Sequence, residues 1–280
     1  MPKNESVWDK LLNIPQLVVA VAIFILMIIP MIKPLGLPVP IATPAKKYFD
    51  ALEAVPDGSR IIFFHECSGS GWDEIKGGTV ATIKYLWQRR FKVVYVSITA
   101  ANVPCMVTAF AMANPEKYGV EYGEEWVFLG YIPGEEAAVA ACASDLHAAT
   151  SADYKGNPIS DLEMMADIHS YQDIDLVITY FGDATGMEKY IRQWFVSYGI
   201  PQCWGTPAGN EAGCVPYMSA GMCEGYVSGP TGGATIEKLI HEPGEAARIA
   251  DMKNLASIPI ILLVILGNIA YFAKKLKKEG

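Results

Sequence analysis

This chain of 280 residues has fewer basic than acidic residues, 22 Lys and Arg against 30 Asp and Glu, and it lacks the common metal-binding motifs. The formal net charge is −8 even though the C-terminal tail, with Lys274, Lys275, Lys277 and Lys278, is basic, so the rest of the chain is more acidic than the whole. This balance argues against a nucleic-acid partner, whose phosphates need a basic surface. The six cysteines contain no CxxC pair and the histidines no HExxH spacing, so the sequence predicts no metal site.

Motifs for nucleotide binding and acyl transfer are also missing. The glycine-rich turn Cys67–Gly71 is not followed by the GK[ST] of a P-loop, and the run that begins at Gly69 lacks the third glycine of a dinucleotide fingerprint. The next apolar strand ends at Thr99 without the acidic residue that would hold a ribose. No G-x-S-x-G nucleophile elbow occurs. The sequence therefore predicts neither a cofactor nor catalytic residues.

Two long apolar runs lie near the ends of the chain. Ser257–Ala273 carries no charge and is nearly long enough to cross a bilayer, which takes about 20 residues. The length of Leu17–Ile32 favours an uncleaved anchor over a signal peptide cleaved near Thr43–Ala45. The predicted organisation is a tail (1–14), a transmembrane helix (15–32), a proline-rich connector (33–44), an α/β domain (45–254), a second transmembrane helix (255–273) and a basic tail (274–280).

Two spans would place both tails on one side of the bilayer and the domain on the other. Lysines are concentrated in the C-terminal tail, so the positive-inside rule predicts cytoplasmic tails and an extracytoplasmic domain. Asn268 is a polar residue within the second span, and we expect its amide either to bond a neighbouring membrane helix or to reach the headgroups. The expected partners are the lipid bilayer, and a second copy of the chain or other membrane subunits.

Between the two runs, continuous apolar strands alternate with helices. The predicted strands are Arg60–Phe64, Lys92–Thr99, Glu125–Ile132, Asp175–Phe181, Ile200–Gly205 and Gly225–Ser228. Strands that are apolar on both faces are typical of a parallel sheet covered by helices on both sides. Right-handed crossovers then give a Rossmann-like, doubly wound α/β fold with a mainly parallel sheet.

The turns that follow these strands carry the candidate ligand-binding residues. In a parallel sheet such turns gather at one edge, where glycines and hydroxyl side chains let backbone N–H groups face a ligand. The candidates are Ser68, Gly69, Ser70, Gly71, Asp183, Asn210, Thr231 and Gly232. Ordinary turn geometry explains each of these residues taken singly.

The first strand ends in three reactive side chains, His65, Glu66 and Cys67. Because side chains alternate along a strand, His65 and Cys67 are expected on one face and Glu66 on the other. The sequence favours a hydrogen-bonded histidine at the strand end over a base for a cysteine nucleophile.

Two segments resemble a known group of proteins. Tyr122–Ala137 (YGEEWVFLGYIPGEEA) and Pro216–Ile240 (PYMSAGMCEGYVSGPTGGATIEKLI) are similar to an uncharacterised family of membrane-anchored α/β proteins with a span at each end. That resemblance implies the architecture and no activity. The order of strand, SG-turn, helix and strand also looks like that of membrane-bound ClpP/crotonase-type serine proteases. Where those enzymes carry a serine, this chain reads Ala100–Val103 (AANV), which implies that such an activity is lost.

Three functions remain after these exclusions. The first is a membrane-anchored, non-catalytic subunit or assembly protein that displays the α/β domain. The second is a sensor whose turns bind a small molecule. The third is a membrane-anchored hydrolase of unknown substrate, which the absence of an intact catalytic set makes the least favoured.

Overall fold

The computed structural model describes residues 14–32, 35, 37–38, 40–67 and 69–279. The chain divides into two units, of which one is the α/β unit Val39–Ala246. The other is the terminal unit, Met1–Pro38 with Ala247–Gly280.

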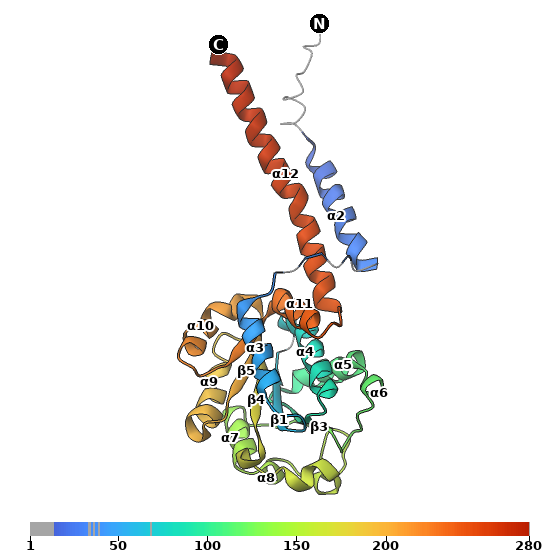
Figure 1. Ribbon diagram of the computed structural model, residues 1–280, viewed down its shortest axis with the longest axis vertical. Coiled ribbons are helices and arrows are strands. Elements are labelled where there is room, and N and C mark those ends of the chain that lie inside the picture. The colour runs from blue at the N-terminus through green and yellow to red at the C-terminus, as the bar shows by residue number, and fades with distance from the viewer. Residues whose placement is uncertain (1–13, 33–34, 36, 39, 68, 280) are drawn as a thin grey trace. The chain divides into compact units, whose positions relative to one another are not determined.

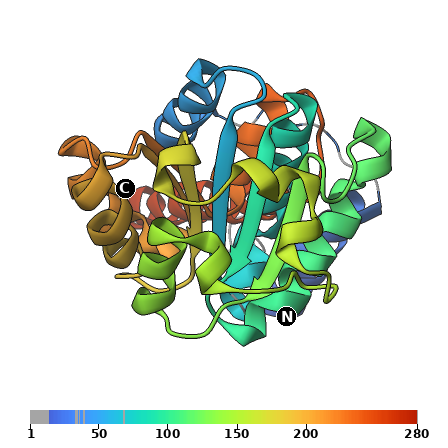
Figure 2. The ribbon, with the colours of Figure 1, turned by 90° about the horizontal axis from the view of Figure 1, so that it is seen from below.

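The α/β unit is built on one sheet of six strands, and every neighbouring pair is parallel (Figures 1 and 2). The strands are β1 (Arg60–Glu66), β2 (Lys92–Ser97), β3 (Trp126–Tyr131), β4 (Leu176–Phe181), β5 (Gln202–Thr206) and β6 (Gly225–Ser228). Their order across the sheet is β3-β2-β1-β4-β5-β6, the order of Rossmann-type doubly wound folds. The prediction of a Rossmann-like parallel α/β fold is confirmed.

Helices cover both faces of this sheet, as the apolar strands require. On the first face the core includes Phe63 and Tyr95 with side chains from four helices, and on the second it includes Phe64 and Trp194. The first face carries α3 (Thr43–Ala54), α4 (Ser70–Gln88), α5 (Val103–Ala113) and α11 (Gly229–Leu239). The second carries α7 (Glu136–Ser144), α8 (Leu146–Ala149), α9 (Met187–Tyr190), the π-helix η5 (Ile191–Val196) and α10 (Glu211–Ser219).

Short elements complete the connections. Helix α6 (Pro115–Tyr118) precedes β3, and the remaining turns are 3-10 helices. They are η1 (Ala100–Asn102), η2 (Ile159–Asp161), η3 (Glu163–Asp167), η4 (Tyr171–Asp173) and η6 (Ala208–Asn210). The Ser160–Ser170 region is therefore a series of tight turns, and its buried Met164 and Met165 still join the core of the second face.

Glycines allow two close approaches on the first face. Gly77 on α4 lies against Ala246, where an added Cβ would come within 2.6 Å of the alanine Cβ. Gly225 at the start of β6 lies against α3, where an added Cβ would lie 2.1 Å from the Tyr48 backbone nitrogen. Both positions require glycine because the neighbouring main chain occupies the space of a side chain.

The terminal unit contains α2 (Gln16–Ile32) and, from Ala247 onward, α12 (Glu245–Glu279). Within the described residues one helix is long and apolar enough to cross a membrane, over Glu245–Lys275. This segment contains the predicted span 255–273 and extends beyond it at both ends. The 17 described residues of α2 are apolar but shorter than the roughly 20 that a bilayer requires.

Polar contacts hold the connector to α12 within the terminal unit. The Asp251 carboxylate accepts hydrogen bonds from the backbone nitrogens of Leu35 and Leu37 at 2.8 and 3.0 Å. The Asn268 amide donates to Val264 O of its own helix at 2.8 Å. That bond satisfies one donor of the amide within the chain, and the expected contact of Asn268 with another membrane helix stays a prediction.

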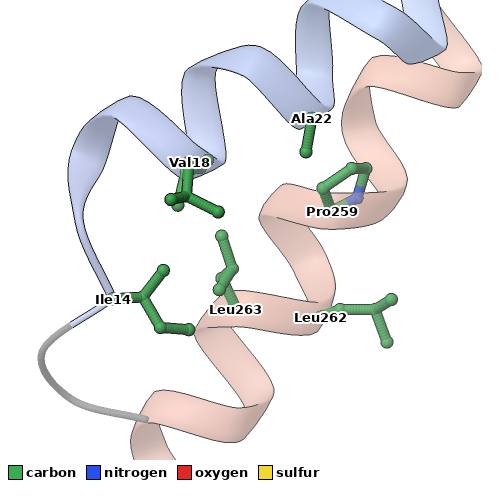
Figure 3. Close-up of a pocket in the computed structure, with 7 residues that line it drawn as sticks. Ile14, Val18, Ala22, Pro259, Leu262 and Leu263 are labelled. Carbon is green, nitrogen blue, oxygen red and sulfur yellow. The ribbon is translucent and has the colours of Figure 1, made fainter. Parts of the chain in front are cut away.

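Apolar side chains line a cavity of about 270 Å³ in the terminal unit (Figure 3). Val18 and Ala22 on α2 face Leu263 and Pro259 on α12 across it. The cavity carries no polar lining, which is the composition expected where helices meet in a hydrocarbon environment.

Candidate functional site

The strand order reverses between β1 and β4, at the centre of the sheet. The chain leaves β1 for α4 on the first face and leaves β4 for α9 on the second. In open α/β sheets the carboxyl ends of the two strands at such a point leave a crevice that ligands occupy. The carboxyl ends of β1 and β4, with the turns that follow them, are therefore the candidate site and are called the reversal point below.

The predicted ligand-binding residues follow the carboxyl ends of β1, β4, β5 and β6, which are consecutive neighbours in the sheet. Ser68 lies outside the described residues. Gly69 and Ser70 are exposed, Gly71 is half-buried, Asp183 and Thr231 are exposed, Asn210 is half-buried and Gly232 is buried. All of these residues lie at one edge of the sheet, as the parallel topology requires.

Two of these residues have roles within the turns themselves. Asp183 Oδ1 accepts hydrogen bonds from the backbone nitrogen and hydroxyl of Thr185, at 3.0 and 3.2 Å. Asn210 Nδ2 donates to Gly182 O at 3.0 Å and so ties the turn after β5 to the turn after β4. Whether these side chains also bind a ligand stays a prediction.

The turn after β1 begins with a thiol surrounded by glycines. The Cys67 sulfur lies so close to Gly71 that an added Cβ would approach it to 2.7 Å, and an added Cβ on Gly182 would lie 3.1 Å away. The backbones of the two turns thus meet over Cys67. Burial raises the pKa of its thiol to about 12, so the sulfur remains a protonated, unreactive filler.

Gly232 has a packing role. An added Cβ would lie 3.1–3.3 Å from Val227, which belongs to the preceding strand. An added Cβ on the neighbouring Gly233 would likewise lie 2.8 Å from the Gly78 backbone nitrogen, where α11 packs against α4. Packing against Val227 thus explains a glycine at position 232 without a ligand. The Thr231 carbonyl accepts a hydrogen bond from the Thr235 hydroxyl at 3.0 Å.

On the first face, the reversal point ends in buried polar groups that have no partner. His65 is fully buried, and neither of its ring nitrogens has a hydrogen-bond partner among the described residues. It lies opposite Ser97 on β2 and Tyr180 on β4, with the Trp72 ring 5.4 Å away between centroids. The Ser97 and Thr99 hydroxyls and both polar atoms of the Asn102 amide are likewise unpartnered in the described structure.

Burial decides the protonation state of His65. It lowers the pKa of the imidazole to about 3, an effect that the nearby Asn102 amide partly opposes, so the ring is neutral at physiological pH. Because the Asn102 amide lies close enough to affect the His65 pKa, a hydrogen-bonded histidine at this strand end stays a prediction. We call His65, Ser97, Thr99 and Asn102 the polar cluster.

On the second face, Glu66 ends β1 with its side chain only 3% exposed. Its Oε2 accepts a hydrogen bond from Lys189 Nζ on α9, and its Oε1 has no partner among the described residues. Burial raises the pKa of Glu66 to about 7, against the lowering effect of Lys189, and the carboxylates of Asp183 and Glu135 raise it further. The predicted alternation is confirmed, because Cys67 packs on the first face and Glu66 turns to the second.

The elements around Glu66 are unusual. Glu135, directly before α7, has a φ of +47°, a strained conformation for a residue with a side chain. Helix α9 continues into the six-residue π-helix η5, and π-helical segments are often found at functional sites. Sequence reasoning missed the pairing of Glu66 with Lys189 because the two residues are 123 positions apart.

The described side chains contain no complete catalytic or metal-binding set. No group of three or more His, Cys, Asp or Glu side chains converges on a metal position within them. All six cysteines are described, and none forms a disulfide. Ser97 and His65 are neighbours, but both are buried, and no hydrogen bond links them in the described structure.

The fold and the reversal point define a Rossmann-like α/β domain with an acidic edge and buried polar groups. No known protein family, curated protein or solved structure matches this chain.

Proposed function

We propose that this protein is a membrane-anchored, non-catalytic binding subunit whose α/β domain holds a small polar ligand at the reversal point. The single observation that supports it most is the set of buried, unpartnered polar atoms on both faces of the carboxyl end of β1. An unpartnered buried donor or acceptor costs about 1–3 kcal/mol, and buried polar groups in folded proteins are nearly always hydrogen-bonded to protein, water or a ligand. Their location where strand order reverses is the position that ligands take in this class of fold.

We therefore favour a protein that binds a small molecule over one with a purely structural role. A protein that only assembled with others would gain nothing from unpartnered polar groups inside the sheet edge. The hydrolase reading has less support, since the neutral, buried His65 lacks a hydrogen-bonded nucleophile and Ala100–Asn102 supplies no serine. Association with a second copy or another membrane subunit remains compatible with the binding role.

The ligand-binding proposal is tested with the full chain in detergent. A library of small cationic, neutral and anionic metabolites is screened for compounds that raise the melting temperature. We expect at least one compound to stabilise the protein, and Ser70→Trp, which places a bulky ring at the exposed start of α4, to weaken its binding at least tenfold. Gln172→Trp is the control, because Gln172 is exposed and lies before β4 at the opposite edge. Equal binding by both variants would contradict the proposed location.

We further propose that α2 crosses the membrane as well as α12, so that the chain has two spans. The support is its apolar composition and its apolar contact with α12 across the cavity of Figure 3. A chain truncated after Asn254 loses the apolar part of α12. We expect it to stay in the membrane fraction after alkaline carbonate extraction, and a chain that also lacks residues 1–38 to be released. Release of the chain truncated after Asn254 would contradict a membrane span at α2.

The orientation of the domain is tested by chemical labelling. With both tails cytoplasmic, the α/β domain faces the outside of the cell. We expect a cysteine at exposed Ser151, in a Cys105→Ala background, to react with a membrane-impermeant maleimide on intact cells. Among the native cysteines only Cys105 is partly exposed, so the background stays low. Labelling that begins only after lysis would place the domain in the cytoplasm.

A further inference from the structure

We infer that the ligand of the reversal point is an uncharged molecule rich in hydroxyl groups, a small sugar or another polyol, which the polar cluster binds through hydrogen bonds. This inference rests on the proposed binding function and adds the chemical class of the ligand. It concerns the first face of the sheet, at the carboxyl ends of β1 and β2.

The backbone brings the members of the polar cluster together. His65 is the direct neighbour of Ser97 where β1 pairs with β2. Both side chains lie on the first face, because each follows two residues after a core residue of that face. Asn102 ends η1 and directly precedes α5, which covers the same face, and its amide lies close enough to the His65 ring to affect the pKa of the imidazole.

Most hydrogen-bonding atoms of the cluster are buried without a partner. Ser97 and Asn102 are fully buried, and neither the Ser97 hydroxyl nor either polar atom of the Asn102 amide has a partner among the described residues. A bond between His65 and Asn102 would use one atom of each. It would leave the other ring nitrogen, the other amide atom and the hydroxyls of Ser97 and Thr99 open. Folded proteins rarely leave so many neighbouring polar atoms unsatisfied, so the cluster indicates a bound molecule.

The donors and acceptors of the cluster favour a hydroxyl ligand. A serine or threonine hydroxyl, a neutral imidazole and a primary amide can each both donate and accept hydrogen bonds. A ligand hydroxyl does the same and pairs with any of them. An ammonium group only donates and a phosphate or carboxylate only accepts, so each would satisfy one half of the cluster. Water shares the property of a hydroxyl and is the alternative that the experiment must exclude.

The cluster also carries no charge. Burial lowers the pKa of His65 to about 3, so the imidazole is neutral, and the other three side chains have no ionisable group. A charged ligand placed among these side chains would lose its hydration without meeting an opposite charge, which is costly. The cluster therefore favours an uncharged ligand.

The molecular surface lies next to the cluster on two sides. Ala100 and Ala101 of η1 are exposed, although the next residue, Asn102, is buried. Trp72, in the first turn of α4, is half-buried, and its ring meets His65 edge to face with 5.4 Å between the centroids. Aromatic rings beside a few polar side chains are the usual lining of small-molecule sites. We expect a ligand to enter between these two elements.

The inference is tested by calorimetric titration of the full chain in dodecyldimethylamine oxide, a detergent without a sugar headgroup, at pH 6. Glucose, ribose, myo-inositol and erythritol are the uncharged probes. Glucosamine is the cationic probe and glucose 6-phosphate the anionic one. We expect at least one uncharged probe to bind, and both charged probes to bind at least tenfold more weakly. Stronger binding of a charged probe would contradict the inference.

Substitutions in the cluster give a second readout. Ser97→Ala removes one hydroxyl, and Asn102→Leu replaces the amide by an apolar group of similar shape. Each should weaken polyol binding at least fivefold. Without polyol, Ser97→Ala should not lower the melting temperature, because an unpartnered buried hydroxyl does not stabilise the fold.

Thr179→Val is the matched control. The Thr179 hydroxyl is also buried and unpartnered in the described structure, but it lies on the second face, since its neighbours Ile178 and Tyr180 pack on the first. The control should bind polyol as the wild type does. Wild-type affinity in both Ser97→Ala and Asn102→Leu would contradict the role of the cluster.

The remaining outcomes separate the two proposals. If Asn102→Leu does not fold, Ser97→Ala and Thr99→Val decide. If no polyol binds, but another compound binds in a manner sensitive to Ser70→Trp, the hydroxyl inference is wrong and the binding function stands. The same conclusion follows if a crystal structure grown with the probes shows only water at the cluster. If no compound of any class binds at the reversal point, both are wrong.

Discussion

Replacement of Lys189 by methionine should lower the free energy of unfolding by about 1–2 kcal/mol at pH 8, because the buried Glu66 loses its partner and avoids a larger cost by taking up a proton. Glu66 is almost completely buried and bonds Lys189 directly. Methionine preserves the length of the side chain and removes only the ammonium. The measurement is equilibrium urea unfolding in detergent, followed by tryptophan fluorescence.

The same variant should lose much less stability at pH 5. The pKa of Glu66 is raised from 4.5 to about 7 in the folded protein, so its protonated form is the one that folding favours. That contribution is complete below about pH 4.5 and is lost as the pH rises through 7. Without Lys189, which lowers this pKa, Glu66 takes up a proton more readily, and at pH 5 it is neutral and no longer needs a cation.

Two controls define the result. Lys46→Met removes a half-exposed partner of Asp50 on α3, and a pair of that kind is worth less than about 1 kcal/mol. Combining Lys189→Met with Glu66→Gln should restore most of the stability at pH 8, because no buried charge then remains. A loss that is the same at pH 5 and pH 8 would show that packing, and not the charge of Glu66, explains the effect.

A single methyl group at position 225 should be more damaging. In Gly225→Ala the new Cβ would lie 2.1 Å from the Tyr48 backbone nitrogen and 2.7 Å from the Lys47 carbonyl carbon. Since main-chain atoms cannot turn away as a side chain can, α3 must move off β6. We expect a loss of about 3 kcal/mol, which corresponds to a drop in melting temperature of roughly 6–12 °C for a domain of this size.

Gly209→Ala is the matched control for this substitution. No atom lies within 4 Å of the position that a Cβ would occupy at Gly209, in the turn after β5. Its φ is not in the left-handed region, so alanine is tolerated. The change should alter stability by less than about 0.5 kcal/mol. Similar losses for the two variants would mean that the contact between α3 and β6 is not tight.

The six strands were predictable because each is a continuous apolar segment bounded by turn-forming residues. The predicted strand Asp175–Phe181 differs from the observed Leu176–Phe181 by one residue, and Gly225–Ser228 is identical. Burial on both faces also predicts parallel pairing, which every strand pair shows.

For the site, local sequence was sufficient to place the candidate turns at one edge of the sheet. It could not distinguish glycines that face a ligand from those that pack, as Gly232 does against Val227. It also could not show that the Asn102 amide, on a different element, would come close to the buried His65 ring. These distinctions depend on which main-chain atoms come close from other parts of the chain.

Composition and hydrophobic pattern thus determine where the strands form, that they pair in parallel, and that α12 is apolar enough to enter a membrane. These properties depend on neighbours along the chain and on the burial that each residue type favours. The strand order, the reversal between β1 and β4, and the meeting of Glu66 with Lys189 were decided only by tertiary structure. Glu66 and Lys189, 123 positions apart, come together because β4, which leads into α9, pairs beside β1, and no local pattern records that arrangement.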